Sequence, residues 1–168
     1  MTSVIKAILT AIISATALII VTQLVFFFPF YMTIVTETLN LANVAANDNY
    51  VKKTYYTDCL EGIKARPIFS KRSSSVIIEI KNADGWDAVG DDDEFSYSAY
   101  DDIALPGGGY KPYRQRGEAI TVSVSAVYPL DLSLWGRPIH HDVPVSFQMT
   151  TIGLRYYKDL DMDLALMP

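Results

Sequence analysis

The residues best suited to binding a metal form two short clusters. His140, His141 and Asp142 stand together, and residues 91–94 are a run of four acids. A zinc site usually needs four histidine or cysteine ligands, and the sequence adds only Cys59 to these two histidines. A calcium site needs oxygens at the alternating spacing of a loop such as the EF-hand, which the acidic run lacks. We interpret the histidines as a solvated turn and the acids as an exposed loop.

No other pattern indicates catalysis. The glycines at 107–109 lack the Lys-Ser/Thr pair and the preceding strand of a phosphate-binding loop. No serine occupies a nucleophile elbow, and Cys59 has no paired histidine in a recognisable motif. As the single cysteine, Cys59 is interpreted as a small packing residue, with a reactive or intermolecular thiol as the alternative. The sequence predicts no catalytic residue, cofactor site or metal ligand, and therefore a protein that is not an enzyme.

The stretch that organises the chain is residues 5–36. No side chain from Ala7 to Thr36 is charged. As a helix, this run would span about 45 Å, more than the roughly 30 Å of a bilayer core. Lys6 precedes it, which favours a cytoplasmic N-terminus. We expect insertion into the inner membrane. The net charge of −5 argues against a nucleic-acid partner.

Two positions within the apolar run are unusual. Gln23 carries an amide that needs a hydrogen-bond partner in lipid, which it would find on another helix, near the headgroups or in its own helix. Pro29 deprives the Val25 carbonyl of its helical partner. We expect a kink or a locally unwound turn between Val25 and Pro29. It would be either a plain kink within an aromatic belt or a weak point that melts in a polymer.

The helical pattern continues beyond the apolar run. Apolar residues recur at three- and four-residue spacings over residues 37–64, with a possible break at 47–49. Pro67 disfavours helix at the residue before it. We therefore predict a helical unit over residues 1–66, with an apolar part at 5–36 and an amphipathic part at 37–64.

Residues 67–168 are predicted to form a β-rich head of about 100 residues. The best strands cover 75–81, 118–128 and 143–154, with Pro129 ending the second and 130–138 connecting it to the third. In the second strand, Ile120, Val122, Val124 and Ala126 share one face. Short strands are expected around 94–100. A head this small is expected to take part of its core from the helix. The predicted fold class is α+β, a long kinked helix followed by a small antiparallel sheet.

This order of elements resembles the type IV pilin architecture of pilins and pseudopilins, and more specifically the TadE-like proteins. The last hairpin carries the resemblance through residues 119–128, Tyr128-Pro129-Leu130, Val143-Pro144-Val145 and Tyr156-Tyr157-Lys158. Lys6-Ala7 followed by Ile8 is a conceivable leader cleavage site, and it would put Pro29 about where pilins keep their helix-melting proline. One departure is that no residue from Ala7 to Thr36 is acidic, whereas pilins have a glutamate early in the apolar helix.

The resemblance implies a structural subunit of an extracellular helical filament. The chain would start in the membrane and then pack against copies of itself, with an assembly ATPase as a possible further partner. The alternative is a single-pass minor pseudopilin or a component of a secretion or conjugation apparatus. The residues expected to pack in the filament core are Ile8, Ile12, Ile19, Leu24, Phe27, Phe30 and Ile34.

Overall fold

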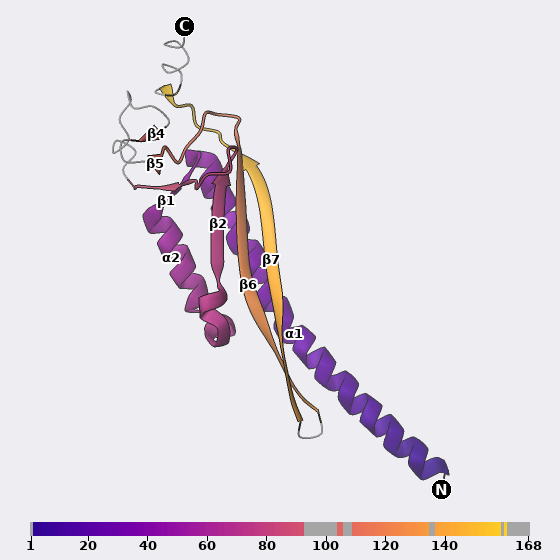
Figure 1. The fold of residues 1–168 in the computed structure, drawn as a ribbon. Coiled ribbons are helices and arrows are strands. Elements are labelled where there is room, and N and C mark those ends of the chain that lie inside the picture. Colours follow the sequence, from indigo (N-terminus) through magenta and orange to yellow (C-terminus); the bar gives the residue numbers. More distant parts are fainter. Residues whose placement is uncertain (1, 93–103, 106–108, 135–136, 159, 161–168) are drawn as a thin grey trace.

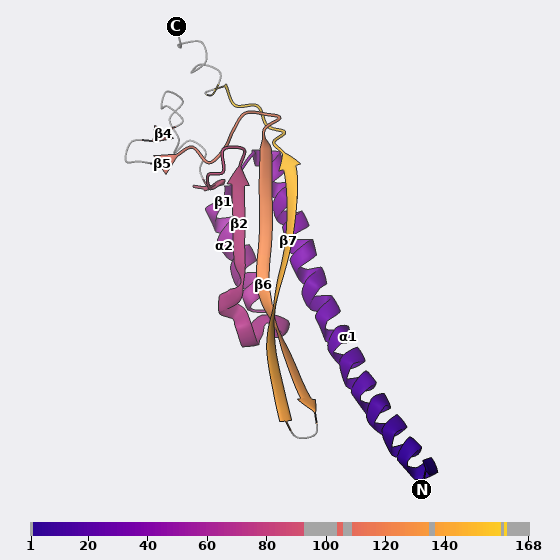
Figure 2. The ribbon, with the colours of Figure 1, turned by 45° about the vertical axis from the view of Figure 1, so that its right-hand side comes forward.

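The computed structural model describes residues 2–92, 104–105, 109–134, 137–158 and 160, and the fold is α+β as expected. A long helix, α1 (Thr2–Asp48), runs along a three-stranded antiparallel sheet of β2 (Ile77–Asn82), β6 (Ala119–Leu134) and β7 (Arg137–Ile152) in the order β2-β6-β7. The sheet covers only the second half of α1, so the N-terminal half projects from the head (Figures 1 and 2).

The two faces of the sheet differ because side chains alternate along each strand. On β6, Ile120, Val122, Val124 and Ala126 are buried, as the alternation predicted. Ile78 on β2 and Phe147 on β7 are the register partners of Val124, so all three strands contribute to this apolar face. The opposite face carries polar pairs, including Thr121 opposite Thr150 and Ser125 opposite Ser146. The apolar face contacts α1, which confirms that the helix supplies part of the core.

The β6–β7 hairpin is longer than predicted. The expected end of the second strand at Pro129 and the expected connection at 130–138 are both wrong, because Pro129 pairs with Asp142 within the ladder and β7 begins at Arg137. Pairing of β2 with β6 stops at Ser125, which leaves the rest of β6 with an open edge. A strand with an open edge tolerates proline because the missing N–H need not interrupt a ladder.

The chain reverses at Asn49, within the possible break at 47–49, so the helical pattern to Lys64 is divided between α1 and α2. Asn49 has a φ of 59°, in the left-handed region that asparagine tolerates best among residues with a side chain. Its Nδ2 donates to the carbonyl oxygens of Arg114 at 2.8 Å and Arg155 at 2.7 Å, and its Oδ1 accepts from the Arg155 N–H. Gly153 packs so closely that an added Cβ would lie 2.5 Å from the Asn49 Cγ. Tertiary contacts therefore convert the possible break into a turn.

The segments after the reversal return along α1. β1 (Val51–Lys52) pairs in parallel with β3 (Val89–Gly90), and α2 (Lys53–Lys64) follows it. The η1 segment (Pro67–Ser75) then leads into β2. Arg66, between α2 and η1, forms an ion pair with Glu37 in the second half of α1. A small hairpin of β4 (Ala104–Leu105) and β5 (Gly109–Tyr110) completes the strands, and the strands expected near 94–100 lie outside the described residues.

An aromatic cluster fixes α1 to the head. Phe30 is fully buried, with its ring centroid 4.4 Å from that of Phe69 on η1 and 5.1 Å from that of Tyr128 on β6. Phe28, two residues earlier, is 62 % exposed on the other side of the helix. Within one helical turn, one phenylalanine is therefore part of the buried core and another is exposed at the surface.

We expect Phe30→Ala to destabilise the head by about 3–5 kcal/mol, because it removes a buried ring and leaves a cavity. Phe28→Ala is the matched control and should change stability by less than about 0.5 kcal/mol. Urea unfolding of the detergent-solubilised chain, followed by circular dichroism, measures both values. Equal losses for the two variants would contradict the packing described here.

Candidate functional site: the bare half of α1 and the hairpin beside it

The first half of α1 is almost entirely uncovered. Every described side chain from Ser3 to Ala15 is exposed, and most of those from Thr16 to Pro29 are exposed as well. Among the described residues, α1 is the one helix long and apolar enough to cross a membrane, judged by length and composition. The bare segment contains no charge after Lys6. A surface of this kind is costly to hydrate and is stable only when lipid or protein covers it.

The residues predicted to pack in a filament core fall into two groups. Ile8, Ile12 and Leu24 are exposed, and Ile19 is half-buried. Phe30 and Ile34 have no exposed surface, and Phe27 is half-buried against Tyr128 with ring centroids 5.3 Å apart. The assignment of Phe30 and Ile34 to contacts between copies is therefore corrected: both belong to the core of their own chain. Phe69 on η1 and Tyr128 on β6 pack against Phe30, and Ile34 belongs to the same buried cluster.

The helix continues through Val25 and Pro29 without an unwound turn. Both residues are exposed, and Phe30, which directly follows Pro29, is packed against the head. Thr33 donates its hydroxyl to the Pro29 carbonyl oxygen at 2.9 Å. The role of this position as a melting point within a polymer stays a prediction.

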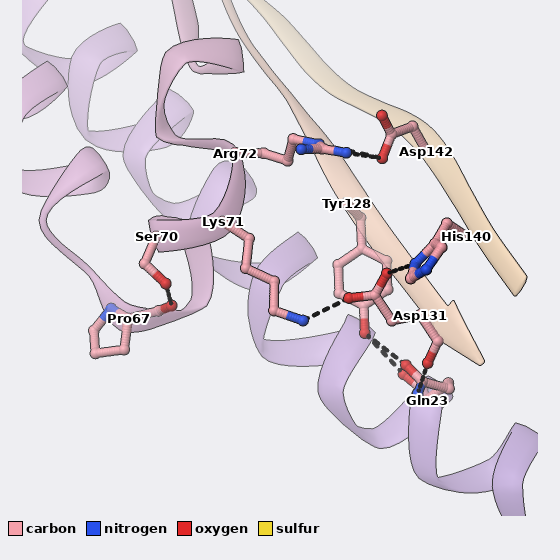
Figure 3. Close-up of polar contacts among 9 residues, drawn as sticks. All are labelled: Gln23, Pro67, Ser70, Lys71, Arg72, Tyr128, Asp131, His140 and Asp142. Carbon is pink, nitrogen blue, oxygen red and sulfur yellow. Dashed lines mark hydrogen bonds and ion pairs between the residues drawn. The ribbon is translucent and has the colours of Figure 1, made fainter. Parts of the chain in front are cut away.

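Gln23 joins the helix to the hairpin. Its Nε2 donates to the Asp131 carbonyl oxygen at 2.9 Å, and the Tyr128 hydroxyl lies 3.3 Å from the Gln23 carbonyl oxygen (Figure 3). The amide therefore finds its partner on the β6–β7 hairpin of its own chain, and not on another helix, at the headgroups or within α1 as expected. By contrast, Thr10, Thr16 and Thr22 donate to carbonyl oxygens four residues earlier in α1. These polar groups on the bare segment need no neighbouring helix to satisfy them.

Asp131 is the centre of a charged cluster at this level. Lys71 Nζ lies 2.5 Å from one carboxylate oxygen and His140 Nδ1 lies 2.8 Å from the other (Figure 3). The hydrogen bond from Lys71 and then that from His140 lower the pKa of Asp131 from 3.8 to about 2. Arg72 pairs with Asp142 3.2 Å away. Basic residues of η1 thus tie the hairpin to the rest of the head.

The histidine cluster is not a turn. His140, His141 and Asp142 lie in β7, so the prediction of a solvated turn is wrong, although all three side chains are exposed. Across the described residues, no group of three or more His, Cys, Asp or Glu side chains is placed to hold a metal ion. Asp91 and Asp92 contact Tyr50 and the backbone of Thr54, and residues 93–94 lie outside the described part of the chain.

Cys59 lies half-buried on α2 and packs against the core beside Leu60. Its Sγ is 3.8 Å from a carboxylate oxygen of Glu37. Burial and this neighbouring charge raise the pKa of the thiol to about 11. A thiol that stays protonated at neutral pH is a poor nucleophile, which favours the packing role.

Two grooves flank the Gln23–Tyr128 contact. One, of about 270 Å³, lies between α1 and the inner face of the hairpin; its lining is Ile20, Gln23, Leu24, Phe27, Tyr128, Leu130, Leu132 and Val143. The other, of about 320 Å³, lies between α1, η1 and β6; its lining is Gln23, Phe26, Pro67, Ile68, Ser70, Lys71, Tyr128, Pro129 and Asp131. The first groove is lined almost entirely by apolar side chains. The second is lined by both apolar and polar residues and has the Lys71–Asp131 pair at its side.

Comparison of the chain with protein-family models, with curated proteins and with solved structures gives no match. The function therefore has to be inferred from the geometry. That geometry is a folded head with a bare apolar rod, and the junction between the two is marked by Gln23 and the Asp131 cluster. The sequence indicated the rod but not the junction, because Gln23 and Lys71 are distant from Asp131 in the sequence.

The Asp131 cluster predicts a specific titration. The carboxylate of Asp131 should titrate near pH 2, and Lys71→Gln should move this midpoint toward 3.8 because the main stabilising hydrogen bond is lost. Since the pKa is lowered in the folded chain, the pair stabilises the hairpin above about pH 4, and the effect is lost as the pH falls through 2.

Carboxyl carbon NMR of the chain in detergent micelles measures the midpoint. Lys64→Gln is a suitable control, because Lys64 precedes η1 and makes no contact with Asp131 in the described structure. An Asp131 midpoint near 3.8 in the unsubstituted chain would contradict the hydrogen-bond geometry.

Proposed function

We propose that this chain is a structural subunit of an extracellular helical filament, similar in plan to a type IV pilus. The observation that carries the proposal is the bare, uncharged half of α1. Such a segment is stable in a bilayer before assembly and would be stable again inside a bundle of identical helices. Each square ångström of apolar surface removed from water stabilises the polymer by roughly 25 cal/mol.

The distribution of exposed residues supports this arrangement. Apolar side chains are exposed around the whole circumference of the first half of α1, including Ile8, Leu9, Ile12 and Ile13. Past the junction, exposure is confined to the face opposite the sheet, where Phe28 and Met32 lie. A central bundle would cover the first region completely and the second on one side, with the heads outside. Repeated heterologous contacts of this kind extend without closing.

A second candidate function is a membrane-anchored module that stays single, such as a minor pseudopilin or a secretion component. One observation favours it: the polar side chains of the bare segment form hydrogen bonds within their own chain, so the helix needs no polar partner from another copy. These side chains are Thr10, Thr16, Thr22 and Gln23. The bare segment can then remain in lipid, and the head would bind a protein partner.

Shearing of cells that produce the chain separates the two candidates. A filament subunit should appear in the sheared supernatant as long fibres that sediment and are visible by negative-stain electron microscopy. A single-copy anchor should remain with the membrane fraction. Complete retention in the membrane of cells with an active assembly system would contradict the filament proposal.

Pro29→Ala tests the predicted melting point. Replacing proline restores a backbone donor for the Val25 carbonyl and should stabilise the helix by about 3 kcal/mol at this position. Filaments made of the variant should be fewer or stiffer, as measured by persistence length in electron micrographs. Thr36→Ala, at an exposed site further along the same helix, is the control. Identical filaments from the Pro29→Ala variant would show that the melting role is wrong.

A further inference from the structure

We propose that the end of the head beside Gln23, formed by η1 and the distal part of the β6–β7 hairpin, rests on an anionic phospholipid surface while α1 is in the membrane. We call this surface the membrane-proximal face; its described members are residues 64–75 and 129–132 with 137–142. The inference rests on membrane insertion of α1, which is the first step of the proposed function, and not on filament assembly.

The length of the bare helix is the first argument. The head begins to cover α1 at Ile20 and Gln23, where the hairpin contacts it. From Lys6 to Gln23 the helix rises about 25 Å, slightly less than the roughly 30 Å hydrocarbon core. A helix this short brings this end of the head close to the bilayer surface, where lipid charge can decide whether the head docks on it. If Lys6 lies at one surface, Gln23 and the residues around it lie at the other.

The shape of the head extends this argument. Leu132 on β6 lies at the level of Ile20, and the ends of β6 and β7 reach further toward the N-terminal end of α1 than η1 does (Figures 1 and 2). Ile139 on β7 and Ile68 on η1 are partly exposed. Apolar groups at this depth, next to polar ones, suit the interfacial layer of a membrane.

The distribution of charge indicates the class of lipid. The membrane-proximal face contains five basic residues and two acids, Asp131 and Asp142, which leaves nine basic and 17 acidic residues elsewhere in the chain. The basic residues are Lys64, Arg66, Lys71 and Arg72, in a segment without an acid, and Arg137. The acidic remainder of the head would be repelled by anionic lipid, so the basic segment orients the head with this face toward the membrane.

The existing ion pairs do not prevent lipid contact. The Lys71 and Arg72 side chains are 67 % and 49 % exposed, although they pair with Asp131 and Asp142. Exposed ion pairs contribute little net stability in water, so a lipid phosphate can share these cations. The groove beside Lys71, with Ser70 and Ile68 in its lining, provides space for a headgroup.

Depth-dependent fluorescence quenching tests the inference in the full-length chain. Cys59→Ser removes the native thiol, and a fluorophore is attached through Ile68→Cys or, as the control, through Thr54→Cys at the opposite end of α2. The chain is reconstituted into vesicles of phosphatidylcholine alone or with one quarter phosphatidylglycerol, each containing a lipid with a nitroxide on its headgroup.

We expect the label at position 68 to be quenched and the label at 54 to be unaffected, with stronger quenching at 68 in the anionic vesicles. Lys71→Gln combined with Arg72→Gln should lower the ratio of docked to undocked heads about 25-fold in those vesicles, at about five-fold for each cation. The matched control, Lys52→Gln with Lys53→Gln, replaces two neighbouring cations far from this face and should have no such effect.

The inference would be overturned if the two labels were quenched equally. It would also be overturned if quenching at position 68 were the same in vesicles with and without phosphatidylglycerol. Self-quenching at 68 that depends on protein concentration but not on lipid nitroxide would place a second copy on this face and also overturn it. Flotation of the vesicles distinguishes a failure of membrane insertion from a failure of the head to contact lipid. Chain that fails to float refutes membrane insertion itself, whereas floating chain without quenching at 68 refutes only the contact proposed here.

Discussion

Packing of the second half of α1 against the apolar face of the sheet is the contact on which the rest of the structure depends. It buries Phe30 and Ile34 and gives a small head a core that three strands alone could not close. The same contact has a boundary, because the hairpin ends near Leu132 and Ile20. Before that boundary, the helix carries apolar residues that nothing in the described chain covers. One continuous apolar run therefore supplies part of the core in its second half and an uncovered apolar surface in its first half.

The junction between these two halves is polar. Gln23, Tyr128 and Asp131 connect the helix to the hairpin, and Lys71 and His140 surround the Asp131 carboxylate. A polar layer at the end of an apolar rod marks the depth to which the rod can enter a hydrocarbon environment.

Local sequence patterns were sufficient where a single element decides the outcome. The alternation of Ile120, Val122, Val124 and Ala126 identified the central strand and its buried face. The part of β6 beyond Tyr128 was missed because Pro129 was taken as the end of the strand, and the part of β7 before Val143 was missed because Pro144 was placed near the beginning of the strand. The pairing of the two long strands puts both prolines inside the ladder. The candidate site was half visible from the sequence: the bare rod was evident, but the Asp131 cluster joins residues about 60 positions apart.

The sequence by itself determined that a long uncharged helix precedes a β-rich head, because hydrophobic length and side-chain alternation are properties of neighbouring residues. Only the tertiary structure decided where that helix stops being free and where the chain turns back. Both outcomes depend on contacts between distant segments. Phe69 on η1 and Tyr128 on β6 pack against Phe30, and the backbones of Arg114 and Arg155 hold the amide of Asn49, which adopts a left-handed backbone conformation. A periodic pattern fixes which face of a helix is apolar, but it does not specify what will cover that face.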